Sequence, residues 1–369
     1  MGRASLPALP PAAAIGSAAP YPSVQDAGFA GWRAGTPAPL LILVEPLGEF
    51  GRIERFFRPL TAGFPGAFAL TDDAAVIDVP AGAELVVTTD AVLAGVHFLP
   101  GDPPEDVARK ALRVNLSDLA AKGAQPLAYT LTLAIGGDIP DAWVERFASG
   151  LAADQALYGI ALAGGDSVST PGPVTVSITA MGLVASGKMV RRSGARAGDT
   201  VFVTGTIGDS ALGLAVLMRR LVVSPDDEAM LTARYRLPQP RSSLASAIST
   251  HAHAAIDISD GLAADFGHLC RASGVSGEIL LPRIPLSPAA RRVLEADPAR
   301  LSSILAGGDD YEILFTAPPE SAAALAEAAL CQGVALTGIG HIEAGEARSR
   351  IIGASGLPVR LDRLGWTHA

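Results

Sequence analysis

Apolar and polar positions alternate along the chain from residue 47 onwards with two different periods. Runs rich in β-branched residues, with partial alternation of apolar and polar positions, predict β-strands because successive side chains of a strand point to opposite faces. Strands mixed with helices in two successive halves indicate an α/β or α+β chain. The predicted strands are 84–93, 127–135, 173–184, 200–205, 253–261 (which runs on into a helix) and 311–316.

Amphipathic patterns between these strands predict helices. At the start of the first helix, Asp102, Pro103 and Glu105 form a capping-box pattern with proline in the first turn. Gly123, followed by Pro126, is expected to end that helix. The predicted helices are 105–122, 141–158, 208–221 and 320–330.

The pattern breaks at 185–199, where Gly and Arg replace large apolar residues, and we predict the domain junction there. An N-terminal domain is therefore expected at 47–187 and a C-terminal domain at 188–369. Residues 1–46 are rich in Ala and Pro, and prolines interrupt the stretch that a signal peptide would need to be apolar. We expect a disordered extension there.

Composition narrows the class of protein. Of the 369 residues, 49% are hydrophobic and 18% charged, which is typical of a globular chain. The net charge of −9 argues against nucleic acid as a partner, because phosphate backbones attract basic surfaces. No apolar run reaches the length of a membrane span, so no membrane partner is expected. Two cysteines, Cys270 and Cys331, lack zinc-site spacing and fit a reducing cytoplasm.

Acidic residues next to apolar strands carry the main chemical signal. A carboxylate beside a core is costly unless it is paired or bound to a cation. Any one of them could be a helix cap, a turn residue or half of a buried salt bridge, but five such places together favour a shared role. Their neighbours are hydroxyls and glycines, and oxygen-only sites suit Mg²⁺, which usually binds phosphates as well. The acids are Asp72, Asp73, Asp90, Asp118, Asp166, Asp257 and Asp260.

Asp118 is placed unusually within its predicted helix. It follows Val107, Ala111 and Val114 at spacings of three and four residues, so it projects from the apolar face. The alternative is an ordinary ion pair with Lys122, four residues on. An acid on the buried face favours a metal-ligand role.

Glycine loops and a group of arginines leave alternatives open. The loop 205–210 could hold an anion on backbone N–H groups or be a plain tight turn, and it lacks the Lys-Ser/Thr of a Walker A loop. The stretches 164–166 and 307–310 are predicted turns that each add acids. Arg191, Arg192 and Arg196 form either a solvated linker or a phosphate-binding fork. His97 is either a satisfied, half-buried histidine or a substrate contact.

Taken together, the motifs resemble the thiamine-monophosphate kinase family, within the superfamily of aminoimidazole ribonucleotide synthetase and selenophosphate synthetase. The resemblance runs in family order from Gly48 to about Thr316, and VNLSDLAAKGAQP alone is specific for the superfamily. The stretches that carry it are GEFGRIERFF, DDAAVI, TTDAVLAGVHF, KALRVNLSDLAAKGAQP, GGDS, RRSGARAGD, VTGTIGDSA, AIDISDGL and GGDDYE.

The resemblance implies a two-domain synthetase-like fold: an N-terminal α/β domain that binds ATP and Mg²⁺ and pairs through its sheet into a homodimer, and a C-terminal α+β domain. It implies direct in-line transfer of the ATP γ-phosphoryl group to thiamine phosphate, with several Mg²⁺ ions and thiamine diphosphate as product. Matching positions imply three groups of residues: Asp73, Thr88, Thr89, Asp90, Asp118, Asp166, Asp257 and Asp260 for metal; Gly165, Asp166, Arg192 and Ser259 for ATP; and His97, Asp309 and Trp366 for substrate.

Three positions depart from the family pattern. Thr71 replaces a glycine before the first acid pair, Asp309 replaces a glutamate, and Arg363 replaces an aromatic residue, although Trp366 is near. The last two changes bear on substrate affinity more than on chemistry. The competing interpretations are a sister activity of the superfamily and a nucleotide-binding protein with a degraded substrate pocket. Selenophosphate synthesis would call for a reactive cysteine near the N-terminus, and no cysteine precedes Cys270.

Overall fold

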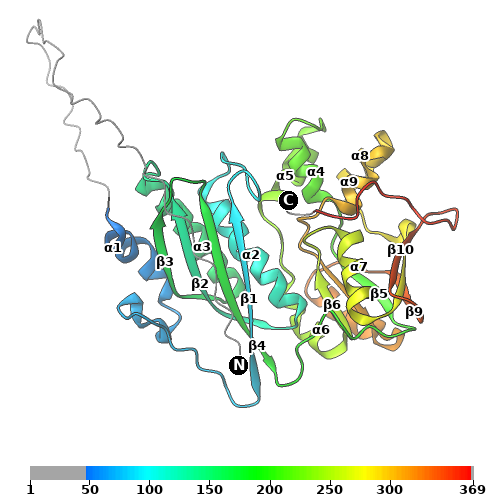
Figure 1. Ribbon diagram of the computed structural model, residues 1–369, viewed down its shortest axis with the longest axis horizontal. Helices are drawn as coiled ribbons and strands as arrows, with labels where there is room; N and C mark the ends of the chain where they lie inside the picture. Colours follow the sequence, from blue (N-terminus) through cyan, green and yellow to red (C-terminus); the bar gives the residue numbers. More distant parts are fainter. Residues whose placement is uncertain (1–46, 367–369) are drawn as a thin grey trace, which may run out of the picture. The chain divides into compact units, whose positions relative to one another are not determined.

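The computed structural model describes residues 47–366 and contains two β-sheets flanked by helices (Figure 1). The extension predicted at 1–46 lies outside the described residues. Both sheets contain mixed strand directions, and helices pack beside each of them, so the chain is a two-domain α/β (α+β) protein, as predicted. Within 47–366, no helix combines the length and apolar character needed to cross a membrane.

The N-terminal sheet has the strand order β1-β4-β2-β3. All neighbouring strands are antiparallel except β2 and β3, which run parallel. Helices α2 and α3 pack together, and α2 lies against β1 and β4 (Figure 1). The strands are β1 Ala83–Leu93, β2 Gln125–Ile135, β3 Ala161–Ser169 and β4 Thr175–Ala185, and the helices are α2 Pro104–Ala121 and α3 Asp141–Tyr158. Short helices precede them: α1 Glu49–Arg52, a π-helical turn Ile53–Phe57, and 3₁₀ turns Arg58–Thr61 and Pro65–Leu70.

The C-terminal sheet has the order β10-β7-β9-β5-β8-β6, with only the β10–β7 pair parallel. Its central strand β5 is buried almost throughout, which explains its continuous apolar run. The strands are β5 Thr200–Thr204, β6 Ala254–Asp257, β7 Ser276–Leu280, β8 Ile313–Ala317, β9 Leu336–Glu343 and β10 Arg348–Ile352. The helices are α4 Asp209–Leu217, α5 Pro225–Arg236, α6 Ala245–His251, α7 Leu262–Ser273, α8 Pro288–Ala296, α9 Leu301–Ala306 and α10 Ala322–Cys331, with 3₁₀ turns at Ser242–Leu244, Leu281–Arg283, Pro298–Arg300 and Pro319–Ser321.

Helix α2 joins the two halves, because it contacts β6 and β8 of the second sheet as well as its own. Lys122 at its C-terminal end donates to the carbonyl of Ala255 in β6 (2.9 Å). Arg113 donates to the carbonyl of Pro238 (2.9 Å). Several polar side chains of α2 are therefore buried like its apolar ones, which is unusual for a helix that covers a single sheet: Lys110, Arg113, Asn115 and Ser117.

Most predicted elements are confirmed within a few residues, but three local predictions are wrong. Helix α2 begins after Pro103 without a side-chain cap, because Asp102 accepts from the amide of Leu99 (2.8 Å) and from Arg236 instead. The stretch 164–166 is not a turn and lies inside β3. Helix α4 ends at Leu217, four residues early. Strands β3, β7, β9 and β10 and helices α1, α5, α6, α8 and α9 were not predicted.

Candidate functional site

A cavity of about 310 Å³ gathers carboxylates from both halves of the chain, and we call it the acid-rich cavity. Its carboxylates come from strand β1, helix α2, the end of β6 with the loop after it, and the segment before β8. Cationic side chains are fewer: Arg192 is the only one that lines the cavity within the described part of the chain. The lining includes Asp90, His97, Asp118, Arg192, Asp257, Ser259, Asp260, Asp309, Tyr311 and Trp366.

Strand β1 and helix α2 place the first two acids. The backbone amide of Asp90 donates to Asn115 Oδ1 (3.0 Å), which ties the strand to the helix. Thr88 Oγ1 donates to Asp118 Oδ2, so the threonine orients that carboxylate. Loss of water around Asp90, followed by the charge of Asp118, raises the pKa of Asp90 to about 6. These two carboxylates therefore repel each other in the absence of a cation.

Strand β6 carries the third acid that lines the acid-rich cavity. Asp257 ends the strand and is buried. Burial, and then the charges of Asp118 and Asp265, raise its pKa well above the ordinary range. A buried carboxylate with two like-charged neighbours is a cation site or a proton site.

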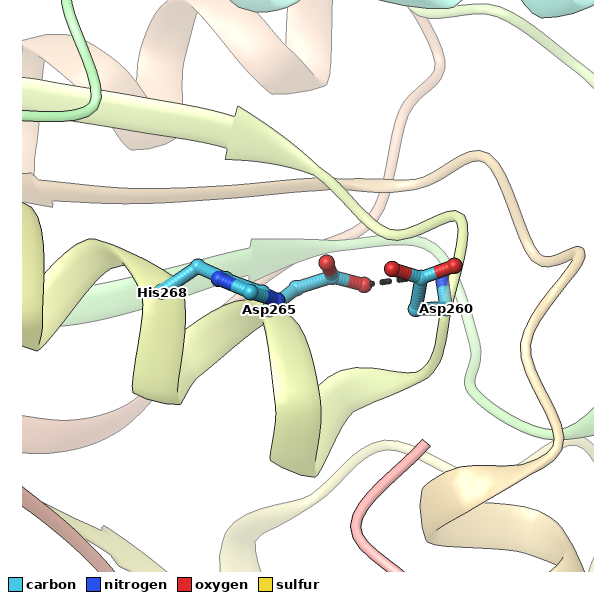
Figure 2. A group of neighbouring side chains, drawn as sticks. All are labelled: Asp260, Asp265 and His268. Atoms are coloured by element: carbon cyan, nitrogen blue, oxygen red, sulfur yellow. Dashed lines mark hydrogen bonds between the residues drawn. The ribbon is translucent and has the colours of Figure 1, made fainter. Parts of the chain in front are cut away.

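The loop after β6 is held in shape by Asp265, in the first turn of α7. Its Oδ2 accepts from the backbone amides of Asp260 (3.1 Å) and Gly261 (3.1 Å). Figure 2 shows Asp265 between Asp260 and His268, and one ligand atom from each lies within 4.8 Å of the others. Burial, and then the charge of Asp260, raise the pKa of Asp265 to about 7. Asp265 thus orients the loop that carries Asp260.

The segment before β8 carries the fifth acid on a left-handed backbone. Asp309 has φ +67°, and its amide donates to the carbonyl of Ser259 (2.8 Å). Asp309 Oδ2 accepts from Lys110 Nζ (2.6 Å) and Ser210 Oγ (3.1 Å). Lys110 is only 2% exposed and lies over the ring of Tyr235, with Nζ 3.8 Å from its centroid. Both contacts are made by Oδ2, and Oδ1 of Asp309 accepts no hydrogen bond from the described residues.

The pKa of the Tyr311 hydroxyl depends on several of these acids, which shows that they lie close together. Burial raises its pKa well above the ordinary range, and four carboxylates raise it further. All four carboxylates therefore lie within electrostatic range of the Tyr311 hydroxyl, although they are up to 219 residues apart in sequence. They are, from the strongest effect, Asp309, Asp90, Asp257 and Asp118.

The remaining predicted residues of this cavity lie on its wall. His97 Nδ1 accepts from the amide of Leu93 (3.1 Å), which fixes the ring on the turn after β1. The amide of Trp366 donates to the carbonyl of Asp260 (2.9 Å), so the C-terminal segment closes over the loop after β6. Arg192 is exposed, and its carbonyl accepts from Ser273 Oγ (3.2 Å).

Three predicted residues lie in a different cavity, of about 420 Å³, beside β3. Asp73, Gly165 and Asp166 line it and do not line the acid-rich cavity. Gly165 is required by packing, because a Cβ there would lie 2.0 Å from the carbonyl oxygen of Leu131. The structure thus divides the predicted metal and nucleotide residues between two places.

The two threonines of β1 point in opposite directions, as neighbours in a strand must. Thr88 faces α2 and Asp118. Thr89 faces the other side of the sheet, where it donates to the carbonyl of Ile178 (3.2 Å) and accepts from Thr179 (3.1 Å). The register of β1, β4, β2 and β3 puts Thr89 on the same face of the sheet as Asp166.

Two of the open alternatives can now be decided on geometry. The loop 205–210 does hold a carboxylate, but an internal one, because the amide of Gly208 donates to both oxygens of Asp310 (2.9 and 3.0 Å). The alternative of an ordinary Asp118–Lys122 ion pair is wrong. In the described part of the chain the lysine donates to the carbonyl of Ala255 instead, and Asp118 accepts from Thr88.

Sequence reasoning missed four residues that line or support the cavity: Lys110, Tyr235, Gly307 and Tyr311. Lys110 had a usable signal, because it lies eight residues before Asp118 with Val114 midway, on the same face of the predicted helix. Tyr235 had none, since it reaches the cavity from α5, which was not predicted.

Comparisons with known proteins identify the family. Residues 71–184 match the AIR synthase related protein, N-terminal domain, and residues 196–352 match the AIR synthase related protein, C-terminal domain. A thiamine-monophosphate kinase of Caulobacter vibrioides is 45% identical, over 88% of this chain and 91% of that protein.

Solved structures agree with this match. The crystal structure of thiamine-monophosphate kinase from Stenotrophomonas maltophilia is 39% identical, with a TM-score of 0.71, and the alignment covers 76% of this chain and 89% of that one. A structure of AaThiL complexed with AMPPCP and TMP is 34% identical, with a TM-score of 0.70, over 81% of this chain and 91% of that one. The chain belongs to the thiamine-monophosphate kinase family, and it is a kinase of that kind.

Proposed function

We propose that this enzyme transfers the γ-phosphoryl group of ATP directly and in line to the phosphate of thiamine phosphate, which yields thiamine diphosphate. The observation that supports this most is the convergence of Asp90, Asp118, Asp257 and Asp309 on one cavity with little compensating positive charge. Two phosphorylated substrates repel each other, and phosphoryl transfer is achieved by positioning and charge neutralisation. A surplus of carboxylates serves that purpose when it binds divalent cations.

The donor set fits Mg²⁺. Its ligand atoms are carboxylate and hydroxyl oxygens. Burial, and then neighbouring negative charge, raise the pKa of Asp90 and Asp257, and a bound cation would offset both effects. Several Mg²⁺ ions held by these oxygens would supply positive charge that offsets the phosphate groups of the two substrates. We propose as ligands Asp73, Thr88, Thr89, Asp90, Asp118, Asp166, Asp257 and Asp260.

The protein's own groups would orient the two substrates. Arg192 offers a guanidinium fork at the cavity wall for a phosphate of ATP, beside Ser259. Gly165 and Asp166 would contact the nucleotide from the cavity beside β3. Thiamine phosphate would contact His97, Asp309 and Trp366, with Asp309 held in place by Lys110.

We also propose a domain boundary, an oligomeric state and a cellular location for the enzyme. The two sheets support a domain boundary near residue 187, with domains at 47–187 and 188–369. The face of the N-terminal sheet that carries Thr89 also carries Val87, which is 56% exposed, and this favours pairing of two copies through that sheet. A cytoplasmic location without nucleic-acid or membrane partners agrees with the metabolic substrate.

The decisive experiment incubates the purified chain with ATP, Mg²⁺ and thiamine phosphate and measures thiamine diphosphate by chromatography. Free thiamine is run alongside as a poor acceptor. We expect product from thiamine phosphate only. ATP that raises the melting temperature without any turnover would instead favour a nucleotide-binding protein with a degraded substrate pocket.

A further inference from the structure

A second cavity of unusual charge lies away from the acid-rich one. It has a volume of about 570 Å³, within the range of small-molecule sites. Four arginines line it, and no carboxylate lines it within residues 47–366. We call it the arginine cavity, defined by Arg109, Arg113, Arg234 and Arg241. In a chain with a net charge of −9, such a cluster calls for an explanation.

Two buried carboxylates behind the wall satisfy part of this charge. Asp154 accepts from Arg113 (2.6 and 2.8 Å) and from Arg109 (3.0 Å). Glu312 accepts from Arg234 (2.8 Å) and from both Nε and Nη2 of Arg241. Both acids are completely buried. Four guanidinium groups thus share two carboxylates as ion-pair partners, and the arginines, not the carboxylates, line the cavity.

Three further carboxylates lie within electrostatic range of these arginines: Asp106 near Arg109, and Asp209 and Asp310 near Arg234. In the described part of the chain none of the three lines the cavity or forms an ion pair with these arginines. One nitrogen of Arg234, Nη1, is buried and has no hydrogen-bond partner there. Unsatisfied buried donors are rare in folded proteins and often mark a missing ligand.

The rest of the wall suits an organic group. Tyr158 lines the cavity and stacks with Arg113, whose guanidinium carbon lies 5.4 Å from the ring centroid. Leu157 beside it is 62% exposed, and Met230 and Leu237 also line the cavity. The four arginines and this apolar wall together match a phosphate group attached to a small apolar or aromatic body.

We propose that the arginine cavity is a second anion site, which binds a phosphate ester dianion independently of the acid-rich cavity. Planar guanidinium groups bind phosphate oxygens in pairs, and four of them line this cavity with no carboxylate beside them on the described wall. The proposal does not depend on which reaction the acid-rich cavity performs.

The test titrates the full-length chain with phenyl phosphate at pH 8, in a metal chelator and at fixed salt, by isothermal calorimetry. Without divalent cations the acid-rich cavity should repel the probe, so we expect one site per chain. Arg109→Gln should weaken binding about tenfold, because a charge-assisted pair of hydrogen bonds is lost. Arg113 still pairs with Asp154 in that variant, so the fold should persist.

Matched variants separate the possible locations. Arg291→Gln changes an exposed arginine outside the cavity and should leave the affinity unchanged, and Arg192→Gln in the acid-rich cavity should also leave it unchanged. Inorganic phosphate should bind more weakly than phenyl phosphate. No binding in chelator, equal loss in Arg291→Gln, or loss in Arg192→Gln but not in Arg109→Gln would each overturn the proposal.

A second measurement covers the case in which Arg109→Gln fails to fold. Hydrogen exchange of the unmodified protein should slow in residues 230–243 when phenyl phosphate is added, because these residues form one wall of the cavity. Protection confined to the segments around the acid-rich cavity would contradict the assignment.

Discussion

The acid-rich cavity and the arginine cavity solve the same electrostatic problem in opposite ways. In the first, carboxylates face one another, and few cationic side chains line the wall. Behind the wall of the second, Asp154 and Glu312 each accept hydrogen bonds from two guanidinium groups. One short segment serves both, since Asp309 lines the first cavity and Glu312 binds the arginines of the second.

This difference distinguishes carboxylates that stabilise the fold from carboxylates that are available to bind a ligand. Asp154 and Glu312 are buried but fully paired, so removing either would leave buried positive charge. Asp118 accepts a hydrogen bond from Thr88, and Lys122 acts on both Asp118 and Asp257 at a distance, but neither acid forms an ion pair among the described residues. Burial alone does not distinguish the two groups, whereas the presence of an arginine partner does.

The largest expected effect tests the unpaired group. Asp118→Asn keeps the size of the side chain but removes its charge, and turnover should fall about 100-fold or more, as for the loss of one preorganised electrostatic group. The melting temperature should not fall, because a repulsive charge beside Asp90 and Asp257 is removed. Steady-state kinetics and circular dichroism measure the two quantities.

The control for this variant is Asp138→Asn, an exposed acid outside both cavities, which should retain normal turnover. Near-normal turnover in Asp118→Asn would rule out its role as a metal ligand. Loss of the folded circular-dichroism signal would place Asp118 with the structural acids instead.

The next effect tests the paired group. Glu312→Gln leaves Arg234 and Arg241 without their counter-charge, and the free energy of unfolding should fall by about 3 kcal/mol, as for other broken buried pairs. Glu320→Gln, at an exposed site, should change it by less than about 0.5 kcal/mol. Urea denaturation measures both. A loss in Glu312→Gln no larger than in Glu320→Gln would mean that the arginines are not held by this carboxylate.

How far the sequence predicts this molecule depends on the range of the interaction. The strands and the helix that carry Asp90, Asp118 and Asp257 follow from local periodicity, and the likeness to a family assigns these acids to one site. Gly165 was read as part of a turn because glycine is common in turns, yet its cause is the carbonyl of Leu131 on the neighbouring strand. Contacts across strands leave no local pattern.

The arginine cavity was beyond prediction for the same reason. Its arginines come from α2, α5 and the segment after α5, and each looks like an ordinary surface residue in its own stretch. Only the folded chain brings them to Asp154 and Glu312. The capping box failed similarly, because Arg236 competes for Asp102 from 134 residues away.

A third effect concerns pH and metal binding in the acid-rich cavity. The pKa of Asp90 is raised to about 6, so this carboxyl is protonated below that pH in the metal-free protein and must lose its proton to bind Mg²⁺. Protonation of Asp90 should therefore lower the affinity for Mg²⁺ by up to about tenfold per pH unit below 6. Asp257, whose pKa is also raised, should add to this fall as the pH decreases. Mg²⁺-induced shifts in melting temperature from pH 5 to 8 measure it.

The raised pKa of Asp90 also determines how the stability of the metal-free protein changes with pH. A carboxyl whose pKa is raised on folding costs stability as the pH rises from its ordinary value of 3.8 to about 6. In Asp118→Asn the repulsive neighbour is gone, so the fall in Mg²⁺ affinity should move to lower pH. A profile that does not move would show that Asp118 does not influence Asp90.

The smallest expected effect concerns substrate binding. Asp309→Glu restores the residue typical of the family and extends the carboxylate by one methylene, so the KM for thiamine phosphate should fall about threefold, the gain of a better-placed hydrogen bond. The gain is limited because φ at this position is +67°, a conformation that Asp tolerates better than Glu. The value of kcat should stay the same, since Asp309 is not among the proposed metal ligands and the substitution changes none of them. Asp138→Glu serves as the control for the added methylene. A change in kcat with KM unaltered would instead place Asp309 with the acids that act on the transferred phosphoryl group.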